Sequence, residues 1–234
     1  MADPAEPDER PSRLRAGALA ALYAVLGVAD YVSAQKKFRL GEWAAKPLLM
    51  PALTAFTLAA SGKRKDTRLP AAGMILGGLG DTALLASEIA PEAASERWFI
   101  PGMGAFAAGH ACSIAALVRD GAHRGVRPGA AAVYAALWAG LIAVLWRRLG
   151  NLRVPVAGYS LLLVTMAVLA SGRNREAAAG GALFVLSDAI IALGLAEIKA
   201  VPRQESAVMP TYLAAQALLA AGWLRPQREI PEKP

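Results

Sequence analysis

The chain is poor in the residues on which many enzyme sites depend. Its single cysteine, Cys112, cannot form an internal disulfide, and two histidines, His110 and His123, are too few for a multi-histidine metal site. No glycine-rich segment ends in Gly-Lys-Ser/Thr and no GxSxG motif occurs, which argues against a P-loop and a nucleophile elbow. Charged residues make up only 18% of the chain, against 56% hydrophobic residues. This balance is typical of a membrane protein.

The hydrophobic residues are concentrated in stretches that are long enough to cross a membrane. A helix crosses the hydrocarbon with about 17 to 25 residues, and stretches of about this length occur at 15–33, 43–60, 69–88, 98–118, 128–147, 154–171, 177–197 and 207–224. Alanine and leucine dominate them, and the period-two alternation of an outer-membrane barrel is absent. The sequence therefore predicts an all-α fold, a polytopic membrane bundle of about eight transmembrane helices.

This bundle leaves little of the chain for a soluble domain. We expect residues 14–225 to form a single eight-helix transmembrane domain, and residues 1–13 and 226–234 to be disordered tails. The links between stretches are short, so successive helices are expected to be antiparallel neighbours. The first stretch does not have the features of a secretory signal, because acidic residues precede it and seven further stretches follow.

The net charge of +7 is distributed over nearly every link and forms no single basic stripe, so nucleic acid is not an expected partner. The charge instead indicates topology. With the N-terminus inside, 15 of the 25 lysine and arginine residues fall on the cytoplasmic side. The positive-inside rule then predicts a multi-pass protein of the cell membrane with both termini in the cytoplasm.

Two carboxylates are predicted to lie deep inside the membrane. Asp81 belongs to the third stretch and Asp188 to the seventh, each about twelve residues after the start of its helix. These helices run in the same direction, so the two carboxylates are expected at the same depth. Ionisable groups within a membrane span are costly and usually functional.

The spacing of polar residues around these aspartates indicates an internal repeat. Lys46 precedes Asp81 by 35 residues, and Arg153 precedes Asp188 by the same number. Downstream, His110 follows the first aspartate by 29 residues and Gln216 follows the second by 28. The pattern suggests two parallel four-helix repeats related by an axis along the membrane normal, so that residues facing this axis meet.

Depth along the helices predicts a shared polar pocket that opens to one leaflet. Besides the two aspartates, the residues expected to line it are Lys46, His110, Tyr212 and Gln216. The alternative is structural: Lys46 and Arg153 would form buried ion pairs with the aspartates and hold the bundle in register, and His110 would hydrogen-bond across to a neighbouring helix. Glycines near Asp81 would then serve only close helix packing.

The same residues also carry a family resemblance. The chain resembles the lysoplasmalogenase (YhhN) family of eight-span membrane proteins in the order and spacing of these motifs: Lys46-Pro47-Leu48-Leu49-Met50-Pro51, Gly80-Asp81, Ala108-Gly109-His110, Leu186-Ser187-Asp188 and Thr211-Tyr212-Leu213-Ala214-Ala215-Gln216. The resemblance implies a hydrolase that cleaves the vinyl ether bond of lysoplasmalogen. The products are a fatty aldehyde and glycerophosphoethanolamine or glycerophosphocholine. It further implies a catalytic pair at Asp81 and Asp188, a lysophospholipid and membrane lipid as partners, and neither cofactor nor metal.

The chemistry of this bond agrees with two carboxylates. Vinyl ether hydrolysis requires an acid that protonates carbon, and the resulting oxocarbenium ion is then captured by water. One carboxyl group can supply the proton while the other stabilises the cation and activates water, as in glycosidases. Lys46 and Arg153 would bind the phosphodiester, and an apolar groove between helices would hold the alkenyl chain.

Two other classes of function are compatible with the sequence. A proton-coupled transporter of a small molecule or lipid would also use carboxylates near the midplane and repeated halves. It would show counterflow in sealed vesicles and leave the vinyl ether intact. A non-catalytic lipid-binding membrane protein would tolerate Asp81→Asn with membrane insertion and lipid association unchanged.

Overall fold

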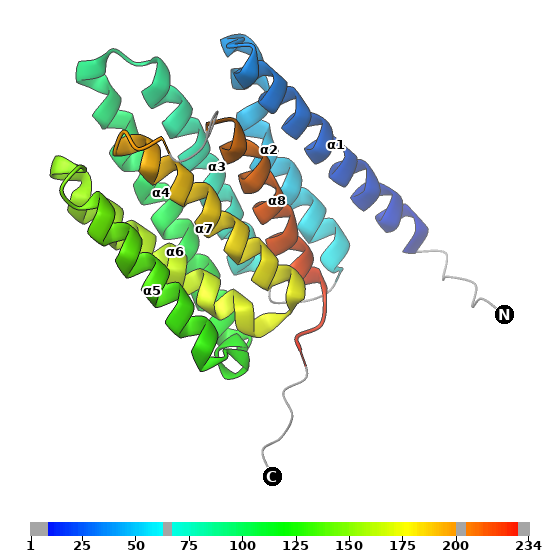
Figure 1. Cartoon of the computed structure of the whole chain (residues 1–234). Helices are drawn as coiled ribbons and strands as arrows, with labels where there is room; N and C mark the ends of the chain where they lie inside the picture. The colour runs from blue at the N-terminus through cyan, green and yellow to red at the C-terminus, as the bar shows by residue number, and fades with distance from the viewer. Residues whose placement is uncertain (1–8, 63–66, 200–204, 229–234) are drawn as a thin grey trace. The chain divides into compact units, whose positions relative to one another are not determined.

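The computed structural model describes residues 9–62, 67–199 and 205–228. In this part of the chain the long elements are all helices and no strand occurs, so the predicted all-α fold is confirmed. Each predicted stretch coincides with one helix (Figure 1): α1 Glu9–Gln35, α2 Arg39–Ser61, α3 Arg68–Ile89, α4 Glu92–Arg119, α5 Pro128–Leu145, α6 Arg153–Arg173, α7 Arg175–Leu195 and α8 Glu205–Leu224. Two short 3-10 helices, η2 Ala122–Gly125 and η3 Gly150–Leu152, lie in the links.

Seven of the described helices are long and apolar enough to cross a membrane, and the chain is a multi-pass membrane protein. The exception is α2, because Arg39, Glu42 and Lys46 lie in its first part and Pro47 and Pro51 follow. These residues lower its hydropathy relative to the other helices. A spanning role for α2, and with it the count of eight spans, stays a prediction.

The predicted tails are shorter than expected. Helix α1 already begins at Glu9, so residues 9–13 are helical rather than disordered. At the other end, the backbone N–H of Arg228 donates to the carbonyl of Arg173 at 2.7 Å. The side chain of Asn174 donates to the carbonyl of Pro226 at 3.2 Å. Residues 226–228 are therefore held by the α6–α7 turn.

The described chain divides into two compact units, and the single transmembrane domain stays a prediction. One unit extends up to Ala105 and the other begins at Phe106, so the boundary lies inside α4. The predicted repeat places this boundary in the link after α4. Helix α2 packs against α3 in the first unit as α6 packs against α7 in the second, which agrees with the proposed correspondence of these helices.

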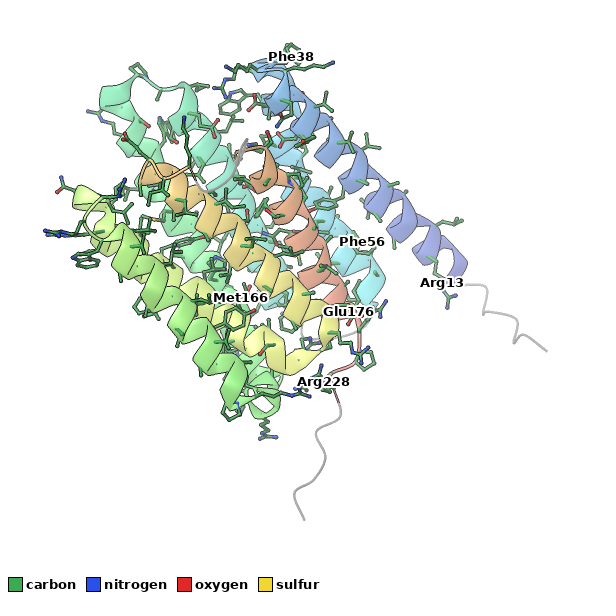
Figure 2. The ribbon with its side chains drawn as sticks, in the orientation of Figure 1. Arg13, Phe38, Phe56, Met166, Glu176 and Arg228 are labelled. Carbon is green, nitrogen blue, oxygen red and sulfur yellow. The ribbon has the colours of Figure 1, made fainter. Side chains whose placement is uncertain are left out.

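In the first unit, α2 packs against both α1 and α3. A Schellman motif ends α1: the N–H of Phe38 donates to Ser33 at 2.8 Å and that of Lys37 to Ala34 at 3.1 Å. Lys37 adopts φ 54°, a left-handed conformation that favours glycine. Figure 2 shows Arg13 and Phe38 at opposite ends of α1. Helix α3 approaches α2 closely, because a Cβ atom on Gly78 would lie 2.8 Å from Met50 Cβ.

In the second unit, α7 packs against α6 and α8. A Cβ atom on Gly180 would lie 2.8 Å from the backbone nitrogen of Leu219 and 2.9 Å from the carbonyl oxygen of Ala215. A Cβ atom on Gly222 would lie 2.9 Å from the backbone nitrogen of Ala177. Small residues therefore bring the two helices close, as is common between membrane helices. This packing fixes the face of α7 that carries Asp188.

A polar cluster closes one end of the second unit. Asn174 caps α7 by accepting a hydrogen bond from the N–H of Ala177 at 2.9 Å. The buried Arg173 forms an ion pair with Asp120 and donates through Nε to the carbonyl of Gly222 at 3.0 Å. Its guanidinium also lies over the ring of Trp223. These contacts hold α6, α7 and the end of α8 together.

Candidate functional site

The two aspartates occupy the same position in their helices. Asp81 lies thirteen residues after Arg68, the first residue of α3, and Asp188 lies thirteen residues after Arg175, the first residue of α7. At a rise of about 1.5 Å per residue both carboxyl groups are therefore about 20 Å along their helices. Asp81 is buried and Asp188 is half-buried. Asp81 belongs to the first unit and Asp188 to the second, so their separation stays a prediction.

Asp188 is held by a tyrosine from the neighbouring helix. The hydroxyl of Tyr159 on α6 donates a hydrogen bond to Oδ2 of Asp188 on α7. The same hydroxyl oxygen lies 3.3 Å from Nε2 of His110. Because its hydrogen is directed at the carboxyl group, the oxygen is left to accept a hydrogen bond from the His110 ring. The contacts form a chain of three side chains from α4, α6 and α7, in which a proton on Nε2 of His110 lets the ring donate to Tyr159.

Aromatic rings enclose this chain and connect it to α8. The Phe184 ring contacts the His110 ring edge-to-face at 4.9 Å and the Tyr212 ring at 5.4 Å. Tyr212 in turn accepts a hydrogen bond from Nε2 of Gln216 at 3.1 Å. Both residues are buried, as is His110. The second unit therefore brings four of the predicted site residues into one continuous cluster.

Arg153 lies apart from this cluster. It is the first residue of α6, its side chain is exposed, and its guanidinium lies over the Trp146 ring at 5.6 Å. Within the described residues no ion pair joins Arg153 to Asp188. The partner of Asp188 is the hydroxyl of Tyr159. The structural alternative of an Arg153–Asp188 ion pair is therefore wrong.

In the first unit, Asp81 is within electrostatic reach of a tyrosine. Tyr23 on α1 is buried and close enough to Asp81 for the charge of the carboxylate to act on its phenol. Lys46 is half-buried. It lies seven residues after Arg39, the first residue of α2, and therefore not at the start of its helix. No ion pair joins it to Asp81 in the described ranges, so that structural alternative is wrong as well. Lys46 instead acts electrostatically on a third aspartate, Asp30 of α1.

Asp30 is fully buried, and neither of its carboxyl oxygens has a hydrogen-bond partner. The nearby Glu42 and Glu88 share one basic partner, since Arg39 lies 3.4 Å from the first and 3.1 Å from the second. Among the described residues, no three histidine, cysteine, aspartate or glutamate side chains group as metal ligands do. The acidic residues of this unit therefore do not form a metal centre in the described ranges.

Two residues of the site, Tyr159 and Asp30, are not singled out by the sequence pattern. Tyr159 belongs to no motif, and its contact with Asp188 depends on how α6 packs against α7. Asp30 lies near the end of the predicted stretch 15–33, where a charged residue is unremarkable. A signal was present, since the predicted stretch 15–33 already contains Asp30.

Comparison with known proteins identifies the family of the chain. The model of the YhhN family matches residues 41–223. Two curated relatives that carry the name Lysoplasmalogenase, from Mycobacterium bovis and Mycobacterium tuberculosis, are each 33% identical over 145 residues. The match covers 57% of this chain and 54% of each relative, so it spans about half the length of these proteins. No solved structure matches the chain significantly. Since the family model covers well over half of its residues, the chain belongs to the YhhN family.

Proposed function

We propose that the protein is a membrane hydrolase that cleaves the vinyl ether bond of a lysoplasmalogen, with Asp81 and Asp188 as the catalytic carboxyl groups. The observation that carries this proposal is the pair of carboxyl groups at the same position in α3 and α7, one of which accepts a hydrogen bond from a tyrosine. The name of the two mycobacterial relatives supports the same activity. The products are a fatty aldehyde and a glycerophospho-alcohol.

In the proposed mechanism, protonation of carbon comes first. Asp81 acts as the general acid and gives its proton to the vinyl carbon that is not bonded to oxygen. The other vinyl carbon becomes an oxocarbenium ion, whose charge is balanced by the ionised Asp188. We assign the ionised role to Asp188 because its Oδ2 accepts the hydrogen of the Tyr159 hydroxyl. Such hydrogen bonds favour the charged form of a carboxyl group.

Water then completes the reaction and restores both groups. Asp188 removes a proton from water as the oxygen adds to the cation, which gives a hemiacetal. Asp81, now ionised, takes the hemiacetal hydroxyl proton, while Asp188 protonates the glycerol oxygen as the carbon–oxygen bond breaks. The aldehyde and the alcohol leave, and each aspartate has returned to its starting state. The proton balance therefore requires no further group.

Carboxyl-to-amide changes test the proposal. Purified protein in detergent is incubated with lysoplasmenylethanolamine, and aldehyde release is measured for the parent chain, Asp81→Asn and Asp188→Asn. Each substitution is expected to lower kcat by about 10² to 10⁴, because an amide is nearly isosteric but neither donates the proton nor balances the cation. Glu176→Gln on α7 is the matched control, since its exposed partner Arg225 makes that ion pair worth little. Full activity in a well-folded Asp188→Asn protein would exclude the two-carboxylate mechanism.

A further inference from the structure

Asp30 is a fully buried ionisable group that the proposed mechanism does not use. Its side chain has no exposed surface, and both carboxyl oxygens are without a hydrogen-bond partner. A buried carboxylate without a partner is strongly unfavourable, and a protonated carboxyl group also requires an acceptor for its hydrogen. Within a membrane span such groups face a partner or a functional site. The partner of Asp30 is therefore to be sought outside the described protein atoms.

The only basic side chain known to act on Asp30 is that of Lys46. The two are within electrostatic reach, yet no ion pair joins them in the described ranges. The other carboxylates near Asp30 are already paired, because Arg39 contacts both Glu42 and Glu88. A positive and a negative group thus lie near each other without direct contact. This arrangement is complementary to a ligand that carries both charges.

We propose that Asp30 and Lys46 bind the zwitterionic head group of a phosphoethanolamine lipid, the ammonium on Asp30 and the phosphate on Lys46. The inference rests on the proposed function and adds to it the head group of the substrate. A phosphodiester and an ammonium are adjacent in this head group, so a single ligand neutralises both side chains. The binding also provides hydrogen bonds for the carboxyl oxygens of Asp30.

The register of α1 directs the rest of the lipid toward the reacting carboxyl group. Tyr23 precedes Asp30 by seven residues, which is about two turns or 10 Å along the same helix face. Tyr23 is within electrostatic reach of Asp81. A head group at Asp30 thus leaves the glycerol and the vinyl ether free to extend along α1 toward Asp81. The phosphodiester and the glycerol bridge a distance of this order.

The site favours a primary ammonium over a quaternary one. Each N–H of an ethanolamine head group can donate to a carboxyl oxygen, whereas the trimethylammonium of choline has no hydrogen to donate. Choline is also larger, and the side chain of Asp30 is fully buried. The expected order of affinity is therefore phosphoethanolamine, then phosphocholine, then a phosphate monoester without an ammonium.

Binding of saturated lipids tests this proposal separately from catalysis. Probes are 1-alkyl lysophospholipids with ethanolamine, choline or phosphate monoester head groups, because their saturated ether is no substrate for vinyl ether hydrolysis. Dissociation constants are measured with the full chain in detergent. Asp30→Asn is expected to weaken the ethanolamine lipid about tenfold or more and to leave the phosphate monoester unchanged. Lys46→Met is expected to weaken all three lipids.

A matched control removes a neighbouring charge without touching the proposed contact. Glu88→Gln deletes a carboxylate that also acts on Asp30 but is half-exposed and paired with Arg39. Its affinities should equal those of the parent chain. If Glu88→Gln and Asp30→Asn behave alike, or if Asp30→Asn weakens all three lipids equally, the head-group site is excluded.

The parent chain provides a test that needs no folded variant. If it binds the ethanolamine lipid no more tightly than the phosphate monoester, the proposal fails, even when vinyl ether hydrolysis is observed. If it discriminates among the saturated lipids but releases no aldehyde from lysoplasmenylethanolamine, the head-group site stands and the proposed function falls.

Discussion

Removal of one hydroxyl group, in Tyr159→Phe, tests how the geometry of the second unit supports catalysis. This hydroxyl donates to Asp188 and lies 3.3 Å from Nε2 of His110. The phenylalanine ring keeps the contact with the aromatic cluster, so packing of α6 against α7 is preserved. The substitution therefore isolates one hydrogen bond to the carboxyl group that we assign as ionised.

The expected magnitude follows from the type of hydrogen bond. A hydrogen bond to a charged group contributes about 1.5 to 3 kcal/mol. If this contribution is realised in the transition state, its loss lowers kcat by about 10- to 150-fold. KM should change little, because Tyr159 orients a reacting group and does not bind the head group in the proposed arrangement. The predicted result is a kcat effect at nearly constant KM.

Aldehyde release at varied lysoplasmenylethanolamine concentration gives both constants. Tyr134→Phe on α5 is the control, since it deletes the same hydroxyl outside the cluster and should leave kcat unchanged. Asp188→Asn combined with Tyr159→Phe should be no slower than Asp188→Asn alone, because Tyr159 acts through the carboxyl group. A Tyr159→Phe protein with full kcat, or one in which only KM rises, would refute the positioning role.

Three further predictions concern stability and topology. Lys37→Gly should raise the melting temperature in detergent and stabilise the protein by about 1 kcal/mol, because Lys37 ends α1 in a left-handed conformation; Lys36→Gly should give no such gain. Gly180→Ala should destabilise the protein by about 1 to 3 kcal/mol, since the added Cβ would lie 2.8 Å from the backbone of Leu219. Gly158→Ala is its control, with nothing within 4 Å of the added atom. Reporter fusions after Lys37 and after Arg124 should report opposite sides of the membrane, because 15 of the 25 basic residues fall on the cytoplasmic side in the predicted topology. The same side for both fusions would exclude that topology.

Helix positions could be predicted from the sequence because each membrane span requires one continuous apolar stretch of the chain. A stretch of about twenty apolar residues between charged links defines both the element and its ends. The ends that differ from the prediction lie where polar residues continue a helix beyond its apolar part. This is the case at Glu9, where α1 begins, and at Arg39, where α2 begins. Hydropathy alone cannot detect such extensions.

The site could be predicted only in part, because partners across helices depend on packing. The depth of Asp81 and Asp188 follows from counting residues along a helix. The partner of each aspartate cannot be found by counting, since a tyrosine on α6 or on α1 comes near a carboxyl group only after the helices have packed. Equal spacing suggested Arg153 as a partner of Asp188, but Arg153 begins its helix and lies over Trp146.

The predicted repeat relates the two aspartates but not their surroundings. A shift of 107 residues carries Asp81 onto Asp188, and the same shift carries Ala52 of α2 onto Tyr159 of α6. The tyrosine within electrostatic reach of Asp81 is instead Tyr23, which comes from α1. Each carboxyl group therefore has a tyrosine from a different, non-corresponding helix. A duplication that placed both groups at equal depth would leave them chemically alike, and only unlike neighbours can make one an acid and the other an ionised base. In the proposed mechanism, the hydrogen bond from Tyr159 to Asp188 provides this difference.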